Sequence, residues 1–151
     1  NIGVCKESLK GPQMTVGDIR AALQIQPLVM IEISGKNLLR VLEQAMAATY
    51  GLGRYDNDRS AYPYAAGLRY DVEANLDDGS RIALAEVNVE HLGLWRPLNP
   101  RRLYKVVTTR ELATGAHGYQ ELTQVNDYWT EPLPFMAGDA LFDYATKHPY
   151  T

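Results

Sequence analysis

The sequence is poor in the residues that build metal sites and disulfide frameworks. Its 151 residues include one cysteine, Cys5, and three separate histidines, His91, His117 and His148. A single cysteine excludes an internal disulfide framework and a cysteine-rich zinc site, and the isolated histidines argue against a histidine-built one. Acidic side chains (18) nearly balance basic ones (15), so the net charge of −3 creates no general attraction to nucleic acid or anionic lipid.

Long hydrophobic runs are also missing. No window reaches the roughly 18 uninterrupted apolar residues of a membrane span, and no targeting segment, repeat or low-complexity stretch is present. The length suits one soluble domain, since a domain of this size buries about 70% of the surface of its unfolded chain. Because the chain begins Asn1-Ile2-Gly3 without methionine, we expect a piece of a longer protein or a processed chain.

Signatures of self-contained catalysis are absent. There is no P-loop, G-x-S-x-G elbow, H-E-x-x-H helix or G-x-G-x-x-G turn. Asp56, Asp58 and Ser60 have the spacing of the first calcium-loop ligands. However, Ala61 occupies the place of the required glycine and Gly67 that of the bidentate glutamate, which favours a solvated acidic loop. We therefore expect no catalytic residue and no metal ligand in this chain.

Hydrophobic periodicity predicts an α+β domain over residues 1–151 with no internal boundary. A capping box, Thr15 to Asp18, predicts a helix over 16–23, and a longer helix follows Ser34 and ends at Gly51. A last helix is expected from near Asp139 to before Pro149, with Leu141, Tyr144 and Ala145 facing inward. The predicted strands span residues 28–34, 68–74, 81–89 and 103–109.

Glycine, proline and tyrosine mark the connections. The sequence predicts an irregular loop over 51–63, a proline-bounded connector over 95–100, and a glycine loop over 114–118 with a helical turn after it. Ten tyrosines stand against two phenylalanines. We favour tyrosine as amphipathic core and rim over a surface that stacks flat ligands.

Several segments, in order, match the motifs of a known family. They are N-I-G-V-C-K at 1–6 (N-x-G-G-x-R), 15–19 with 23–25 (I-T-x-x-D-V … L-P-F), E-I-S-G-K-N-L at 32–38 with L-E at 42–43 (E-L-T-G-x-x-L … L-E), Y-P-Y-A-A-G-L-R-Y at 62–70 (F-P-Q-V-S-G-L-R-F), and 103–108 with 112–119 (Y-K-V-V-T … L-A-N-G-G-D-G-F). In this order the chain resembles the C-terminal domain of 5′-nucleotidases over nearly its whole length.

The resemblance implies a layered α/β/β/α fold with mixed sheets. It also implies that the chain is one of the two domains of an enzyme. An N-terminal metallophosphatase domain, absent from this chain, would hold two divalent metals, zinc or manganese, and the catalytic residues. The present domain would bind a nucleotide or nucleoside and carry it to those metals, so the chain alone should be inactive. Family members are exported to the periplasm, cell wall or cell surface.

The resemblance also implies a substrate-binding set. Asn1 takes the position of an asparagine that reaches base or ribose, and Gly3 that of a close-approach glycine. Lys6 stands where an arginine holds phosphate, which keeps the charge but loses the paired hydrogen bonds. The alternative for Lys6 is a solvated surface lysine.

The base-stacking positions are partly altered. Ile25 stands where the family has a first stacking phenylalanine. Gly118 and Tyr119 end the glycine motif, and Tyr119 fills the second stacking position. The alternatives are an ordinary core residue for Ile25 and a core or rim tyrosine for Tyr119, and His117 is interpreted as a polar loop group and not as an acid/base residue. The departures leave two alternatives open: a diverged, thiosulfohydrolase-like relative with a non-nucleotide substrate, and a non-catalytic binding domain.

Overall fold

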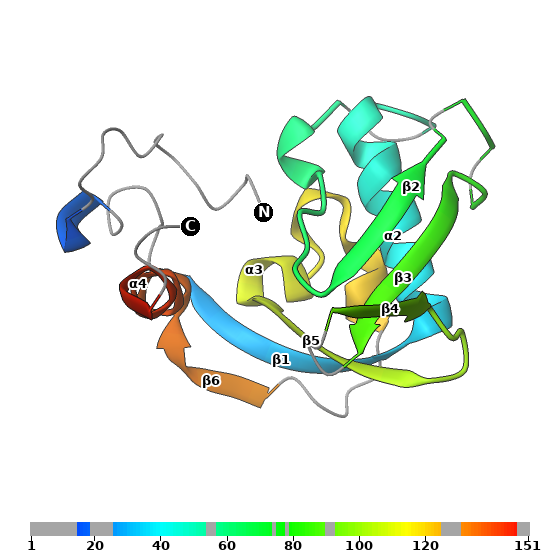
Figure 1. Cartoon of the computed structure of the whole chain (residues 1–151). Coiled ribbons are helices and arrows are strands. Elements are labelled where there is room, and N and C mark those ends of the chain that lie inside the picture. The colour runs from blue at the N-terminus through cyan, green and yellow to red at the C-terminus, as the bar shows by residue number, and fades with distance from the viewer. Residues whose placement is uncertain are drawn as a thin grey trace.

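Two three-stranded antiparallel sheets and helix α2 (Gly35–Tyr50) form the body of the molecule (Figure 1). The computed structural model describes residues 15–18, 26–53, 57–73, 75–77, 79–89, 93–124 and 131–147. The first sheet has the order β5-β1-β6, with β1 at Pro27–Ser34, β5 at Leu103–Thr109 and β6 at Glu131–Met136. The second has the order β2-β3-β4, with β2 at Leu68–Val72, β3 at Ile82–Val89 and β4 at Leu94–Pro97. The expected α+β class is confirmed.

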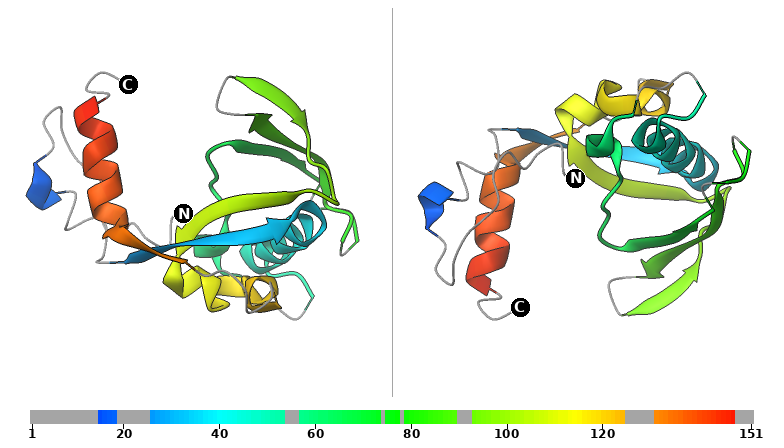
Figure 2. Two further views of the ribbon diagram at one scale, coloured as in Figure 1. Left: turned by 90° about the horizontal axis from the view of Figure 1, so that it is seen from below. Right: turned by 90° about the horizontal axis from the view of Figure 1, so that it is seen from above.

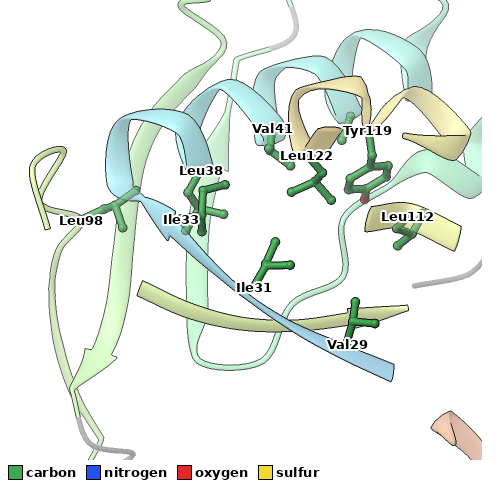
Figure 3. Close-up of a cluster of buried hydrophobic side chains, with 10 residues drawn as sticks. Val29, Ile31, Ile33, Leu38, Val41, Leu98, Leu112, Tyr119 and Leu122 are labelled. Carbon is green, nitrogen blue, oxygen red and sulfur yellow. The ribbon is translucent and has the colours of Figure 1, made fainter. Parts of the chain in front are cut away.

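Strand β1 carries the core because its side chains alternate. Val29, Ile31 and Ile33 are nearly or fully buried and point toward α2, whereas the residues between them are half-exposed (Figure 3). Its neighbour β5 runs antiparallel in a continuous register from Leu28 opposite Thr109 to Ser34 opposite Leu103. Both strands lie within one residue of their predicted bounds.

Helix α2 begins and ends where its sequence predicts. The Ser34 hydroxyl accepts a hydrogen bond from the amide of Asn37 at 3.3 Å, which caps the N-terminus. Gly51 adopts a left-handed conformation (φ 64°) and its amide bonds back to the last turn, which ends the helix. The inward face consists of Leu38, Val41, Leu42, Ala45 and Met46, all buried.

The second sheet confirms one sequence pattern and corrects another. Leu68, Tyr70 and Val72 on β2 are half-buried while the residues between them are exposed, as alternation predicts. The connector expected over 95–100 is instead partly strand β4, which pairs with β3 at the sheet edge. Pro97 is tolerated there because an edge strand does not need every amide for pairing.

The remaining elements are short. Helix α3 (Arg110–Ala113) follows β5, and three 3-10 turns lie at η2 (Arg59–Ala61), η3 (Ala116–Gly118) and η4 (Gln120–Gln124). Helix α4 (Ala137–Lys147) follows β6 and lies at the far end of the first sheet, away from α2 (Figure 2). The helical turn expected after the glycine loop corresponds to η4.

Helix α4 corrects a prediction about its inward face. Tyr144 is 55% exposed, and no side chain of α4 is buried, so the expected inward packing of Tyr144 is wrong. The helix also begins slightly earlier than predicted because Asp139 accepts a hydrogen bond from the Met136 amide at 3.2 Å, which caps its first turn. Strand β6 was not predicted, since two prolines interrupt its pattern.

The capping box near the N-terminus is confirmed. Thr15 and Asp18 exchange hydrogen bonds, from the Thr15 amide to the carboxylate at 2.7 Å and from the Asp18 amide to the hydroxyl at 3.2 Å. Of the expected helix, residues 16–18 are described and are helical. Among the described residues, no helix has the length and apolar character needed to cross a membrane.

Candidate functional site

The glycine loop turns sharply between α3 and η4. Gly115, His117 and Gly118 all have positive φ, at 92°, 54° and 82°. A Cβ at Gly118 would lie 2.5 Å from the Cβ of Ala48 on α2, so only glycine allows the loop to approach the helix this closely. Glycine at position 118 is therefore required for packing against α2 as well as for the turn.

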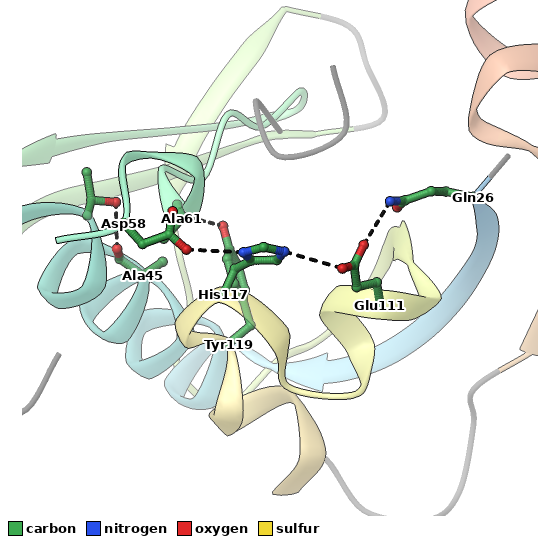
Figure 4. A network of polar contacts seen from close by, with 8 residues as sticks. Gln26, Ala45, Asp58, Ala61, Glu111, His117 and Tyr119 are labelled. Carbon is green, nitrogen blue, oxygen red and sulfur yellow. Dashed lines mark hydrogen bonds and ion pairs between the residues drawn. The ribbon is translucent and has the colours of Figure 1, made fainter. Parts of the chain in front are cut away.

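Tyr119 follows this loop and points into the core. Its side chain is 5% exposed and lies among the buried hydrophobic residues (Figure 3). Its hydroxyl donates to the carbonyl oxygen of Ala61 at 2.9 Å (Figure 4). Burial raises the pKa of the Tyr119 phenol well above its ordinary value. This position is that of a core tyrosine, and the ring offers little free surface to a base in this arrangement. The stacking role remains a prediction.

His117 lies between two carboxylates (Figure 4). Its Nδ1 is 3.1 Å from Oδ2 of Asp58, and its Nε2 is 3.3 Å from Oε1 of Glu111. The hydrogen bond to Asp58 is the largest cause of a raised His117 pKa, which is opposed by partial burial and assisted by Glu111. His117 is thus a polar loop group, as predicted, but one with two specific acidic partners.

The contacts continue from His117 to the first sheet. The second oxygen of Glu111 accepts a hydrogen bond from Nε2 of Gln26 at 2.8 Å (Figure 4). Gln26 is 8% exposed and directly precedes β1. At the other end, the Asp58 amide donates to the Ala48 carbonyl at 2.9 Å, which fixes the Asp58 loop on α2.

The tyrosines of residues 62–70 form a rim beside the core. The rings of Tyr62 and Tyr64 lie 4.6 Å apart between centroids and are tilted by 51°. The Tyr70 hydroxyl donates to the Pro63 carbonyl at 2.6 Å, and desolvation is the main cause of its raised pKa. Tyr64 is 57% exposed. Within the described segments, this agrees with tyrosine as core and rim.

Of the predicted substrate-binding residues, Gly118 and Tyr119 are adjacent and in contact with the core. Asn1, Gly3, Lys6 and Ile25 lie outside the described residues. Gln26, the neighbour of Ile25, is joined to the glycine loop through Glu111 and His117. The sequence gives no local sign of this connection, because Glu111 belongs to no motif and the spacing around Asp58 suggests only a calcium loop.

The described residues offer no metal site. No group of three or more histidine, cysteine, aspartate or glutamate side chains in the described part of the chain is arranged to hold a metal ion. Asp58 instead contacts His117 of the glycine loop. What the arrangement does is hold the glycine loop, the Asp58 loop and the residue before β1 together.

Comparison with known proteins links the chain to one family. The model of the 5′-nucleotidase C-terminal domain matches residues 1–124. A probable 5′-nucleotidase of Treponema pallidum is 28% identical over 127 residues, covering 83% of this chain and 21% of the relative. The structure of a 5′-nucleotidase precursor from Thermus thermophilus superposes with a TM-score of 0.81 at 25% identity, covering 96% of this chain and 27% of that one.

A third similarity shows the fold alone. A sulfate thiohydrolase of Thermus thermophilus superposes with a TM-score of 0.50 at 21% identity, covering 83% of this chain and 20% of that one. The present chain thus spans about a fifth to a quarter of the length of the relatives it matches.

Proposed function

The chain belongs to the 5′-nucleotidase C-terminal domain family, and on this premise we propose that it is the substrate-recognition domain of a two-metal phosphohydrolase. It would bind a nucleotide or nucleoside and position it for hydrolysis of a phosphate ester. The match of the family model to residues 1–124 is the observation that carries the proposal. Because the relatives are several times longer than this chain, the rest of such a protein would perform the chemistry.

The proposed division of labour is the one that the resemblance to the family implies. A metallophosphatase domain N-terminal to this one would hold two divalent metals, zinc or manganese, which activate water for attack on phosphorus. The present domain would contribute orientation, which converts a bimolecular encounter into a positioned reaction. Export to the periplasm, cell wall or cell surface is part of the proposal, since the Thermus relative is described as a precursor.

The proposed binding set keeps the six residues named from the sequence. Asn1 and Gly3 would approach base or ribose, Lys6 would contact phosphate, and Ile25 would form an apolar wall. Gly118 and Tyr119 would form the opposite wall. Since the Tyr119 ring is nearly buried, base contact would use its edge, or would need a shift of the glycine loop.

Binding to the 151-residue chain tests recognition directly. We expect adenosine and AMP to produce saturable shifts in its NMR spectrum. Ile25→Phe restores a stacking ring, worth about 1–3 kcal/mol per base where measured, and should tighten adenosine and AMP alike. Lys6→Arg restores a bidentate phosphate contact and should tighten AMP only.

The matched control for these variants is Gly138→Ala in α4, because an added Cβ at Gly138 would meet nothing within 4 Å. It should leave both affinities unchanged. Absence of binding at millimolar ligand, in the native chain and in Ile25→Phe alike, would contradict nucleotide recognition. That result would favour a non-nucleotide substrate or a non-catalytic binding domain.

Catalysis is tested by assaying the purified chain. With zinc or manganese added, we expect no hydrolysis of AMP above the uncatalysed rate, because the chain contributes binding and not chemistry. A phosphatase rate that disappears on mutation of a residue within the chain would overturn this assignment.

A further inference from the structure

We propose that His117 is a positioning residue, which in its protonated form fastens the glycine loop to the Asp58 loop and to the start of β1. Its consequence for ligand affinity rests on the proposed function, but the fastening itself does not. The family motif gives no sign of this positioning role, because the motif has aspartate where this chain has His117.

The first support is the way His117 joins distant segments. Asp58 is 59 residues away in the chain and Glu111 is six residues away, yet both are in contact with the imidazole. Glu111 in turn accepts from Gln26, which is 85 residues from it. One ring therefore connects the Asp58 loop, α3 and, through Glu111, the residue that precedes β1.

The second support is the backbone of His117. Its φ of 54° and ψ of 36° are left-handed, and it is the one non-glycine residue with positive φ in the described part of the chain. Such a conformation is disfavoured for a residue with a Cβ and persists where surrounding contacts hold it. The two carboxylate contacts are among those that hold His117 in this conformation.

The third support is the hydrogen-bonding chemistry of the ring. A neutral imidazole carries one N–H donor and one bare nitrogen acceptor, while an ionised carboxylate only accepts. Satisfying Asp58 and Glu111 at once therefore requires both ring nitrogens to carry protons. Loss of a proton turns one contact from an attraction into two facing acceptors, so one of the two attachments is lost.

The charges around His117 agree with an imidazole that carries protons on both ring nitrogens. Asp58 faces the ring from the loop ahead of η2, and Glu111 faces it from α3. Helix α2 packs against the same loop through the uncharged Ala48. Both carboxylates raise the pKa of His117 above 6.5, with the Asp58 hydrogen bond as the largest cause. Two negative neighbours thus favour the protonated imidazole of His117, which is the form that holds both contacts.

The consequence for the site follows from the next two residues. Gly118 rests against α2, and the Tyr119 hydroxyl is bound to Ala61 in η2, three residues after Asp58. Release of His117 would free the loop on one side of this pair. We therefore expect the ligand-facing geometry of Gly118 and Tyr119 to depend on protonation of His117.

An NMR titration of the 151-residue chain tests the fastening without any ligand. We expect the His117 imidazole to titrate above 6.5, its ordinary value, and the Gly118 and Tyr119 amides to shift with the same midpoint. Asp58→Asn should lower that midpoint most and Glu111→Gln less. A midpoint at or below the ordinary value, or amides that do not follow it, would overturn the proposal.

Adenosine affinity across the same pH range tests the coupling. Adenosine is preferable to AMP because a phosphate monoester itself titrates near pH 6. We expect the native chain to bind adenosine at least about fivefold more weakly above the His117 midpoint, at the low end of typical couplings between sites. His117→Asn keeps a residue that tolerates positive φ but does not titrate, so its affinity should be independent of pH.

The outcomes separate the two proposals. Equal pH dependence in the native chain and in His117→Asn overturns the positioning role. If adenosine binds at no pH to any variant, nucleotide recognition fails, while the ligand-free titration still decides whether His117 fastens the loop.

Discussion

At the scale of single residues, Tyr119 shows how a motif position can serve packing. The family motif suggests an exposed aromatic platform, whereas the ring is 5% exposed and its hydroxyl is bound to a carbonyl of the fully buried Ala61. A buried hydroxyl with one partner is typical of a core tyrosine. The residue that the sequence singles out for ligand contact therefore also stabilises the fold.

Tyr119→Phe tests that structural role. Removal of the hydroxyl leaves the Ala61 carbonyl without its partner, and an unsatisfied buried acceptor costs about 1–3 kcal/mol. We expect the free energy of unfolding in urea to fall by that amount. Tyr70→Phe is the matched control, because it removes a similar hydrogen bond, to the Pro63 carbonyl, from a half-buried ring. A larger loss from Tyr70→Phe would show that burial of Tyr119 matters less than the structure indicates.

At the scale of elements, α2 organises the molecule. It packs on β1 and contacts η2, η3 and η4, so the glycine loop and the Asp58 loop are both positioned by one helix. Its ends are set by Ser34 and Gly51, and the left-handed Gly51 also lies against Asn57 at the start of the Asp58 loop. The C-terminal end of α2 is thus in contact with the loop whose Asp58 binds His117.

Gly51→Ala tests the importance of this helix end. A Cβ at a φ of 64° would lie 3.1 Å from the Cβ of Asn57, and a left-handed non-glycine residue costs about 1–2 kcal/mol. We expect thermal unfolding at lower temperature and a lower free energy of unfolding. Gly138→Ala in α4, where a Cβ meets nothing within 4 Å, should not destabilise the chain. Equal stability of the native chain and Gly51→Ala would contradict the role of Gly51.

At the scale of the whole molecule, the His117 contacts link stability to pH. The pKa of His117 is raised in the folded chain above the ordinary value of 6.5, so the folded state holds its proton more tightly than the unfolded state. The stabilisation is therefore fully present below 6.5 and is lost as pH rises through the higher folded pKa.

Urea unfolding of the native chain and of His117→Asn, from below pH 6.5 to above the folded pKa of His117, measures this pH-dependent stabilisation. We expect the difference in free energy of unfolding between the two to be largest at low pH and to shrink as pH rises. The difference isolates His117 because the other titrating groups are common to both chains. A difference that grows with pH would mean that the imidazole is held neutral in the folded state.

Much of the fold is readable from local patterns. The alternation in β2, the β-rich apolar residues of β1, and the serine and glycine that bound α2 each act within a few residues, so the sequence predicts their positions well. Strands β4 and β6 contain prolines and form only because a neighbouring strand offers partners. The exposed face of α4 likewise depends on what lies beside it, which periodicity does not reveal.

The sequence by itself determined the α+β class, the main elements and the family, because these depend on side-chain period, capping and ordered motifs. Only the tertiary structure decided that Tyr119 faces the core and that His117 lies between Asp58 and Glu111. The physical reason is distance along the chain. A hydrogen bond between residues separated by 59 positions has no local signature, and it exists only once α2 and the loops around it have packed.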